Sequence, residues 1–562
     1  MPKPDRSRLT GPFEQAITAC RDGWRVLRRR GPGQTKFWFI ALLNGIVAGF
    51  AAVLFRRGIN GLQSLLYGTE DVRLLHSCAE SLPWYLILLI PVFGGLMVGL
   101  ILHRFTDDGQ DRSVADAIEG AALNEGRLEM RAGLASALAS FITLSSGGSS
   151  GREGPVVHLA GVISTWICKQ IKADGITGRD LLGCAVAAAV SASFNAPIAG
   201  ALFALEVILR HFAVHAFAPI TIAAVAGTVV SRLEFGDVRE FTFEAPSALQ
   251  FYVELPAFLI LGLVCSLVAV ILMRGIFLAE NFAGRVQDRT GLPRWLRPAV
   301  AGALLGAIAI FYPHIIGVGN ETTILALQGN LLLYEAIVFA VLKTVAVVIT
   351  IGGRMGGGVF SPSLMVGALS GLSFGLVATA ILPEFSGESS LYAFAGMGAM
   401  AAAVLGAPIS TTLIVFELTG NWQIGLAVMV SVSLSTALAS KLVDRSFFLT
   451  QLERRGVHLA AGPQAYLLAL HRVSSLMRQS DDPRAADRDK CWELIQGGIY
   501  VDETAMLETV MPVFDQAGVA LIPVVSLGRE TATPDLRGAI FYVDALKAYN
   551  RSLADTAAEE HS

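Results

Sequence analysis

The chain has 562 residues, of which 53% are hydrophobic and 16% are charged, and its mean hydropathy is +0.57. Typical soluble domains carry about 25% charged residues, so this composition excludes a cytosolic enzyme and a disordered chain and indicates a protein that spans a bilayer several times. The net charge is −3, and the six cysteines are scattered without a C-x-x-C pair, so neither a disulfide framework nor a zinc site is predicted. We expect no nucleic-acid partner and no enzymatic activity.

The N-terminal segment, residues 1–36, is basic, with nine Lys or Arg residues against three Asp or Glu residues. By the positive-inside rule this segment is cytoplasmic. The first apolar stretch starts near Phe37 and ends at Arg57 without a small-residue cleavage site, which is typical of an uncleaved span. Because Arg454 and Arg455 close the last apolar stretch, both termini are expected in the cytoplasm, and the plasma (inner) membrane is the expected location.

Residues 37–456 form the predicted membrane domain. Three windows in it contain no Asp, Glu, Lys or Arg, and each is long enough to cross a bilayer, which takes about 20 apolar residues; they are Leu181–Leu205, Met355–Pro383 and Leu391–Phe416. Glycine and proline cluster at residues 145–155 and 352–362. Helix breakers at membrane depth are tolerated where the backbone is buried in protein or lines a polar cavity, so these stretches are predicted binding loops.

Two motifs recur in the membrane domain at nearly the same separation. They are Gly151-x-x-x-Pro155 with Gly358-x-x-x-Pro362, and Ala196-Pro197-Ile198 before Glu206 with Ala407-Pro408-Ile409 before Glu417. Coincidence in a chain rich in these residues is the alternative to a repeat. The recurrence predicts an all-α membrane protein of two inverted-topology repeats with broken helices, at about 37–235 and 250–445.

The stretch Gly151-Arg152-Glu153-Gly154-Pro155 is the most informative motif. A glycine-rich turn that opens a helix at Pro155 presents free backbone N–H groups and the positive end of the helix dipole, which together bind anions. Glu153 is then an anion tethered at an anion site, able to leave when it is protonated or displaced, which predicts a gate or a proton carrier. A surface ion pair with Arg152 is the alternative, but the position between uncharged stretches favours function.

These motifs resemble those of the CLC family of chloride channels and chloride/proton exchangers. The matching stretches are 151–155, 194–206, 358–362 and 405–417. The resemblance implies a homodimer with one pore per subunit, which carries chloride and similar monovalent anions across a lipid bilayer. It also implies that Glu153 is the gate and that Gly151, Arg152, Gly154, Val359 and Phe360 belong to the anion site, with the backbone amides around Phe360 as donors.

The chain departs from the family at two positions of the expected pore. The family's first anion loop, GSGIP, is replaced by residues 112–116, where only Ser113 matches. Ser113 either offers its hydroxyl to the anion or merely caps the following helix. The pore tyrosine of the family aligns with Phe448, whose ring narrows the inner pore but cannot donate a hydrogen bond.

A third departure concerns protons. In exchangers of the family a second glutamate, which relays protons, follows the position of Glu206, and here that position is Val207. The relay position is therefore lost. Glu206 and Glu417 are predicted to be structural, at a helix end or a polar interface. His158 is either a group that titrates near neutrality or a buried neutral histidine beside the loop.

Residues 457–562 contain 15 Asp or Glu and 9 Lys or Arg residues, a soluble charge density that predicts a small cytoplasmic α/β domain. We expect strands at Ile499–Val501, Val519–Val525 and Leu536–Val543 and helices at Thr504–Gln516 and Asp544–Arg551. The domain resembles the core of a CBS module, with His471–Met477 as its lead-in strand. Paired CBS modules bind adenine nucleotides, so a single copy either pairs across a dimer or is purely structural; no other cofactor is expected.

The function predicted from the sequence is chloride transport, passive or weakly coupled to protons, with Glu153 as the gate. Three alternatives stay open. They are a chloride/proton antiporter with a different proton relay, a fluoride exporter of the same family, and an unrelated carrier of organic acids. Ser113 and Pro155 weigh against fluoride, and the uncharged windows lack the cationic side chains that a carboxylate carrier needs.

Overall fold

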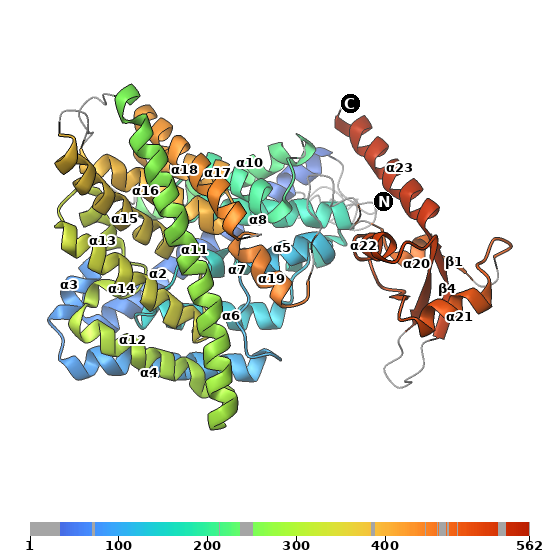
Figure 1. Ribbon diagram of the computed structural model, residues 1–562, viewed down its shortest axis with the longest axis horizontal. Coiled ribbons are helices and arrows are strands. Elements are labelled where there is room, and N and C mark those ends of the chain that lie inside the picture. The colour runs from blue at the N-terminus through green and yellow to red at the C-terminus, as the bar shows by residue number, and fades with distance from the viewer. Residues whose placement is uncertain are drawn as a thin grey trace, which may run out of the picture.

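The computed structural model describes residues 34–69, 74–212, 214–236, 251–383, 388–443, 445–457, 459, 468, 471–479, 482–526 and 535–560. Nearly all of the predicted basic N-terminal segment lies outside the described residues. Within these ranges the chain is mostly helical, and eight helices are long and apolar enough to cross a membrane. Figure 1 shows the helices packed into one body, with the long helix α11 running across its whole height and a small sheet beside it.

The helices before residue 460 follow one another with short connections. The first half contains α2 (Gln34–Tyr67), α3 (Leu75–Glu80), α4 (Trp84–Phe105), α5 (Val114–Leu123), α6 (Met130–Ser145), α7 (Glu153–Ile171), α8 (Gly175–Phe194), α9 (Pro197–Phe203), the π-helix η3 (Ala204–Leu209) and α10 (Val214–Phe235). The second half contains α11 (Phe251–Thr290), η4 (Arg294–Leu296), α12 (Arg297–Phe311), η5 (Pro313–Ile315), α13 (Asn320–Leu327), α14 (Leu333–Gly352), α15 (Phe360–Ile381), α16 (Ser389–Leu405), α17 (Pro408–Thr419), α18 (Trp422–Leu442) and α19 (Phe447–Arg454). The predicted helical membrane fold is confirmed.

The first span is longer than predicted. Helix α2 does not end at Arg57 but continues to Tyr67. The guanidinium of Arg57 pairs with Glu234, and that of Arg56 lies 4.7 Å from the ring centroid of Phe235, both on α10. Because the neighbouring helix supplies these partners, the two arginines are accommodated inside a continuous helix.

Two of the three uncharged windows each contain a helix break, at corresponding places. Helix α8 ends just before Asn195 (φ 57°) and α9 begins with Pro197, while α16 ends just before Gly406 (φ 69°) and α17 begins with Pro408. A left-handed residue terminates a helix, and proline at the first helical position starts the next one without losing a hydrogen bond. The remaining window contains the single helix α15.

The two halves meet at their glycine-rich loops. The backbone N–H of Gly151 donates to the carbonyl of Gly358 (2.7 Å), and the N–H of Gly358 donates to the carbonyl of Gly151 (2.8 Å), as in an antiparallel bridge. A Cβ atom at Gly151 would lie 2.5 Å from Oε2 of Glu153 and 3.2 Å from the carbonyl oxygen of Gly358, so a side chain there would displace the Glu153 carboxylate. Since α7 and α15 begin just after these glycines, one helix from each half directs its N-terminal end to the same place.

The C-terminal part is a four-stranded sheet with helices. Its elements are α20 (Val473–Leu476), β1 (Arg478–Gln479), α21 (Arg488–Gln496), β2 (Val501–Asp502), α22 (Leu507–Ala517), β3 (Leu521–Ser526), β4 (Asp535–Phe541) and α23 (Tyr542–Glu560). The strand order is β1-β4-β3-β2, with β2 and β3 parallel and the other pairs antiparallel. Arg472 Nη2 lies 3.8 Å from Glu125 Oε1, so the sheet domain contacts the helical body.

The predicted lead-in strand His471–Met477 is wrong. Residues Val473–Leu476 form the short helix α20, because the N–H and the hydroxyl of Ser475 both donate to the carbonyl of Arg472 and close a turn. The strand predicted to reach Val543 also ends earlier, at Phe541, where α23 takes over.

Two glutamates cap helices of the opposite half. The carboxylate of Glu206 accepts from the N–H groups of Ile409 (3.0 Å) and Ser410 (2.7 Å) at the start of α17, and also from the Ser410 hydroxyl. The carboxylate of Glu417 accepts from the N–H groups of Ile198 (3.1 Å) and Ala199 (2.8 Å) at the start of α9. The predicted structural role of both glutamates is confirmed, and each ties one repeat to the other.

We predict that Glu206→Ala and Glu417→Ala each lower the free energy of unfolding by about 2–4 kcal/mol, because each removes hydrogen bonds to a charged acceptor that are worth about 1.5–3 kcal/mol apiece. Thermal unfolding of the detergent-solubilised protein measures the loss. The control is Glu388→Ala, since Glu388 is an exposed carboxylate at the start of α16. Equal melting temperatures for all three variants would contradict the capping role.

Candidate functional site

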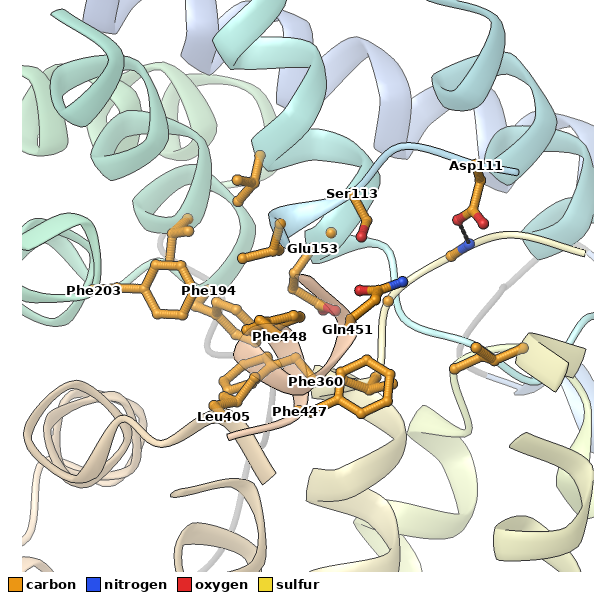
Figure 2. Close-up of a pocket in the computed structure, with 18 of the residues that line it drawn as sticks. Asp111, Ser113, Glu153, Phe194, Phe203, Phe360, Leu405, Phe447, Phe448 and Gln451 are labelled. Atoms are coloured by element: carbon orange, nitrogen blue, oxygen red, sulfur yellow. Dashed lines mark hydrogen bonds between the residues drawn. The ribbon is translucent and has the colours of Figure 1, made fainter. Parts of the chain in front are cut away.

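Three helices begin at one small cavity in the helical body. These are α5 after Ser113, α7 at Glu153 and α15 at Phe360, and the first residues of α19 close the cavity on another side (Figure 2). The volume of about 30 Å³ is enough for a water molecule or an anion of similar size. The polar side chains that line it are those of Asp111, Ser113, Glu153 and Gln451.

Glu153 lies inside this cavity rather than at the surface. It is the first residue of α7, and 4% of it is exposed. Its Oε1 accepts a hydrogen bond from the hydroxyl of Ser361, the second residue of α15. The carboxylate of one half is therefore bound at the helix N-terminus of the other half.

The positive potential of the cavity comes from backbone groups. Among the described residues that line it there is no Lys, Arg or His. The N–H groups in the first turn of a helix have no partner within that helix, and Gly154, Val359 and Phe360 of the first turns of α7 and α15 line the cavity. The N-terminal ends of two helices thus place positive potential at the cavity without a full positive charge.

Two residues predicted to bind the anion, Gly151 and Arg152, are not among the residues that line the cavity. The N–H of Gly151 donates to Gly358 across the bridge, so this amide is not available to an anion. The side chain of Arg152 is buried, donates to the carbonyl of Ser193 (3.4 Å) and lines a second, separate cavity with His76. The predicted part of these two residues in anion binding stays a prediction.

The loop that replaces the family's first anion loop uses its backbone N–H groups for hydrogen bonds within the protein. The N–H of Arg112 donates to Ser136 Oγ (2.8 Å), and the N–H of Ser113 donates to Asp116 Oδ2 (2.7 Å). Ser113 is the N-cap residue of α5 and also lines the cavity. Its hydroxyl, not its amide, is the group available to an anion.

Aromatic rings form the apolar wall of the cavity. Phe448 is buried and lines it as predicted, with its ring centroid 5.8 Å from that of Phe447. The rings of Phe194 and Phe360 pack edge to face with centroids 4.9 Å apart. The wall offers no hydrogen-bond donor at Phe448.

Val207 lies in the buried core, within the π-helix η3, and is not among the residues that line the cavity. His158 is buried on α7, and its Nδ1 lies 3.3 Å from the carbonyl of Ser113. Its place against this carbonyl favours the structural interpretation of the histidine.

Sequence reasoning missed three polar residues at the cavity. Ser361 binds Glu153, Asp111 accepts from the N–H of Gly357 (3.3 Å), and Gln451 lies one helical turn after Phe448 on α19. The spacing of Gln451 from Phe448 was a usable signal, since residues three apart share a helix face. Nothing in the sequence places Asp111 next to Gly357.

The comparisons with known proteins agree with this geometry. A family model described as "Voltage gated chloride channel" matches residues 94–440. The "Putative chloride channel protein ClcB-like" of Ralstonia nicotianae is 32% identical over 397 residues, which cover 70% of this chain and 91% of that protein.

Solved structures resemble the chain in fold. A slow cyanobacterial Cl⁻/H⁺ antiporter aligns with a TM-score of 0.66 at 21% identity and covers 75% of this chain and 98% of its own. A CLC-type fluoride/proton antiporter aligns with a TM-score of 0.59 at 18% identity and covers 77% of this chain and 97% of its own.

We predict that the side-chain amide of Gln451 donates to an anion in the cavity. Gln451→Leu keeps the bulk but removes the donor, so chloride affinity is expected to fall roughly tenfold, the value of one hydrogen bond to a charged group. Isothermal titration of the purified protein with chloride measures the change.

The double variant Gln451→Leu/Phe448→Tyr returns a donor to the cavity and is expected to restore part of the affinity. Thr450→Val is the matched control, because the Thr450 hydroxyl donates to the carbonyl of Arg445 and lies outside the cavity lining. Equal affinities for wild-type protein and Gln451→Leu would exclude this contact.

Proposed function

The chain belongs to the voltage gated chloride channel family, and on this premise we propose that it carries chloride across a membrane through the cavity at Glu153, with the Glu153 carboxylate as the gate. Anion transport is the activity of the family, whereas the gating residue, the ion and the degree of proton coupling are our proposal for this chain. The observation that carries it is the place of the Glu153 carboxylate, buried at the start of α15 where an anion would bind.

The gate operates by competition. While Glu153 is charged, its carboxylate occupies the site that the dipoles of α7 and α15 create for an anion. Protonation removes the charge, and the neutral side chain no longer competes with chloride for the backbone N–H groups. Permeation is therefore expected to increase as the pH on the side that reaches Glu153 falls.

The absence of cationic groups from the described lining also bears on selectivity. Backbone dipoles and hydroxyl groups offset only part of the hydration energy of an anion. Weakly hydrated monovalent anions such as bromide and nitrate therefore pass with chloride, while sulfate and phosphate do not.

Proton coupling is weak or absent in this proposal. The relay position of the family is Val207 in this chain, and a valine cannot bind a proton. The side chain at Phe448 offers no hydroxyl to the anion site either. The buried apolar surroundings of Val207 make the transfer of a bare charge through this region unfavourable by several kcal/mol.

The assembly proposed is a homodimer in a plasma membrane, with both termini in the cytoplasm. Apolar side chains are exposed on the adjacent helices α9, α10, α17 and α18, among them Ile198, Phe217, Ile409, Trp422 and Met429. Such a surface suits contact with a second subunit as well as with lipid. Binding of an adenine nucleotide by the sheet domain would then depend on pairing of two such domains.

We predict that Glu153→Gln, a neutral mimic of the protonated gate, leaves chloride flux present and removes its dependence on external pH. The measurement is chloride efflux from proteoliposomes while the external pH is stepped. An unchanged pH dependence in Glu153→Gln would refute the gating role.

The matched control is Glu129→Gln, because Glu129 precedes α6 and is not among the residues that line the cavity. The same vesicles loaded with fluoride test the ion. Fluoride release that exceeds chloride release would assign the chain to fluoride export instead.

We also predict that a chloride gradient imposed on the vesicles drives little or no uphill proton movement, since no titratable group stands at Val207. A pH electrode in weakly buffered medium records the proton flux beside the chloride flux. A fixed proton-to-chloride ratio would overturn passive transport and establish an antiporter whose relay bypasses Val207.

A further inference from the structure

A second carboxylate, that of Asp111, lines the same cavity as Glu153 (Figure 2). Asp111 belongs to the loop between α4 and α5. Helices α2 and α4 are successive candidate membrane spans, so this loop lies on the side where α2 begins, which is the inner side in the proposed topology. The two carboxylates therefore approach the cavity from different elements, Glu153 from the start of α7 and Asp111 from the inner loop.

The carboxylate of Asp111 binds a backbone N–H group beside the cavity. Its Oδ2 accepts a hydrogen bond from the N–H of Gly357 at 3.3 Å, drawn as the dashed line in Figure 2. Gly357 directly precedes Gly358, Val359 and Phe360, whose backbone lines the cavity. An anion that leaves the cavity toward the inner side would meet the N–H of Gly357 next. The Asp111 carboxylate already occupies this donor.

The two amides that follow Asp111 on this loop are already bound within the protein. The N–H groups of Arg112 and Ser113 already donate to Ser136 and Asp116. An anion that moves between the cavity and the inner side therefore has to compete with Asp111 or pass its negative charge.

We propose that Asp111 is a second gate, on the inner side of the cavity, whose charged carboxylate holds the N–H of Gly357 and excludes the anion until it is protonated. This inference rests on the proposed chloride transport and adds a residue to it. It predicts sensitivity to pH on the inner side that is independent of Glu153.

Several charged groups surround Asp111 and set its titration. Arg455 on α19 favours the charged form, while Asp116 on α5 disfavours it, and these two residues pair with each other at 3.0 Å. Arg112 is committed to Asp108 (3.1 Å) and Asp116 (3.6 Å).

From the other elements, Glu153 faces the cavity on α7, His158 contacts the carbonyl of Ser113, and Arg354 Nη1 donates to the carbonyl of Asp108 (3.4 Å). Burial raises the pKa of Asp111 above the usual aspartate range, against the opposing effect of Arg455. The carboxylate is therefore protonated at a higher pH than an exposed aspartate.

The test uses the full chain with Glu153→Gln as the background, so that the outer gate is neutral throughout. Chloride current is recorded across a planar bilayer while the pH is lowered on each side in turn, from about 7.5 to 4.5. With Asp111 present, flux is expected to rise as the inner pH falls, by up to about tenfold per pH unit while the carboxylate is mostly charged. Adding Asp111→Asn is expected to give the high flux at every pH.

Asp108→Asn is the matched control, since Asp108 lies on the same loop, pairs with Arg112 and does not line the cavity. The inference is overturned if the pH response of the Glu153→Gln protein is the same on both sides, which needs no Asp111 variant. It is equally overturned if Asp111→Asn folds and keeps the inner pH response. Absence of chloride flux in both wild-type protein and Glu153→Gln would instead reject the proposed transport, and the second gate with it.

Discussion

The functional part of the fold depends on the two backbone hydrogen bonds that join Gly151 to Gly358. They hold the N-terminal ends of α7 and α15 side by side, and each end carries roughly half a positive charge. Two like partial charges repel each other unless negative charge lies between them. The bridge and the anion therefore support one another: the bridge creates the site, and either the Glu153 carboxylate or a bound anion compensates the field that the bridge concentrates.

Carboxylates also compensate the partial positive charge of helix N-termini at two other contacts between the halves, and there they stay bound. Glu206 and Glu417 also place carboxylates on helix N-termini of the opposite half, but each accepts from two successive backbone N–H groups and neither lines the cavity. A carboxylate held in this way acts as a structural cap. Glu153 differs because it lines a cavity with room for a small ion, as the proposed gating requires.

The sequence alone predicted the features that depend on residues close together in the chain and the features that recur in it. The repeated Gly-x-x-x-Pro motif located both helix starts and Glu153, because such a turn presents its amides in any context. It did not locate Asp111 and Gln451, whose places at the cavity depend on contacts between distant segments. The mistaken strand at His471–Met477 has a similar cause, since the local hydrogen bonds of Ser475 outweigh the strand preference of its neighbours.

The loss of the relay at Val207 limits how protons and chloride can be linked. With Val207 in the apolar core, a proton from the inner side has to reach Glu153 through the cavity that the anion itself uses. On one shared route the two ions are not forced to move in opposite directions, because an anion in the cavity lowers the free energy of a nearby proton. Strict exchange needs separate routes that join at one residue. A single shared cavity, entered past Asp111 on one side and Glu153 on the other, therefore favours proton-gated conduction over stoichiometric antiport.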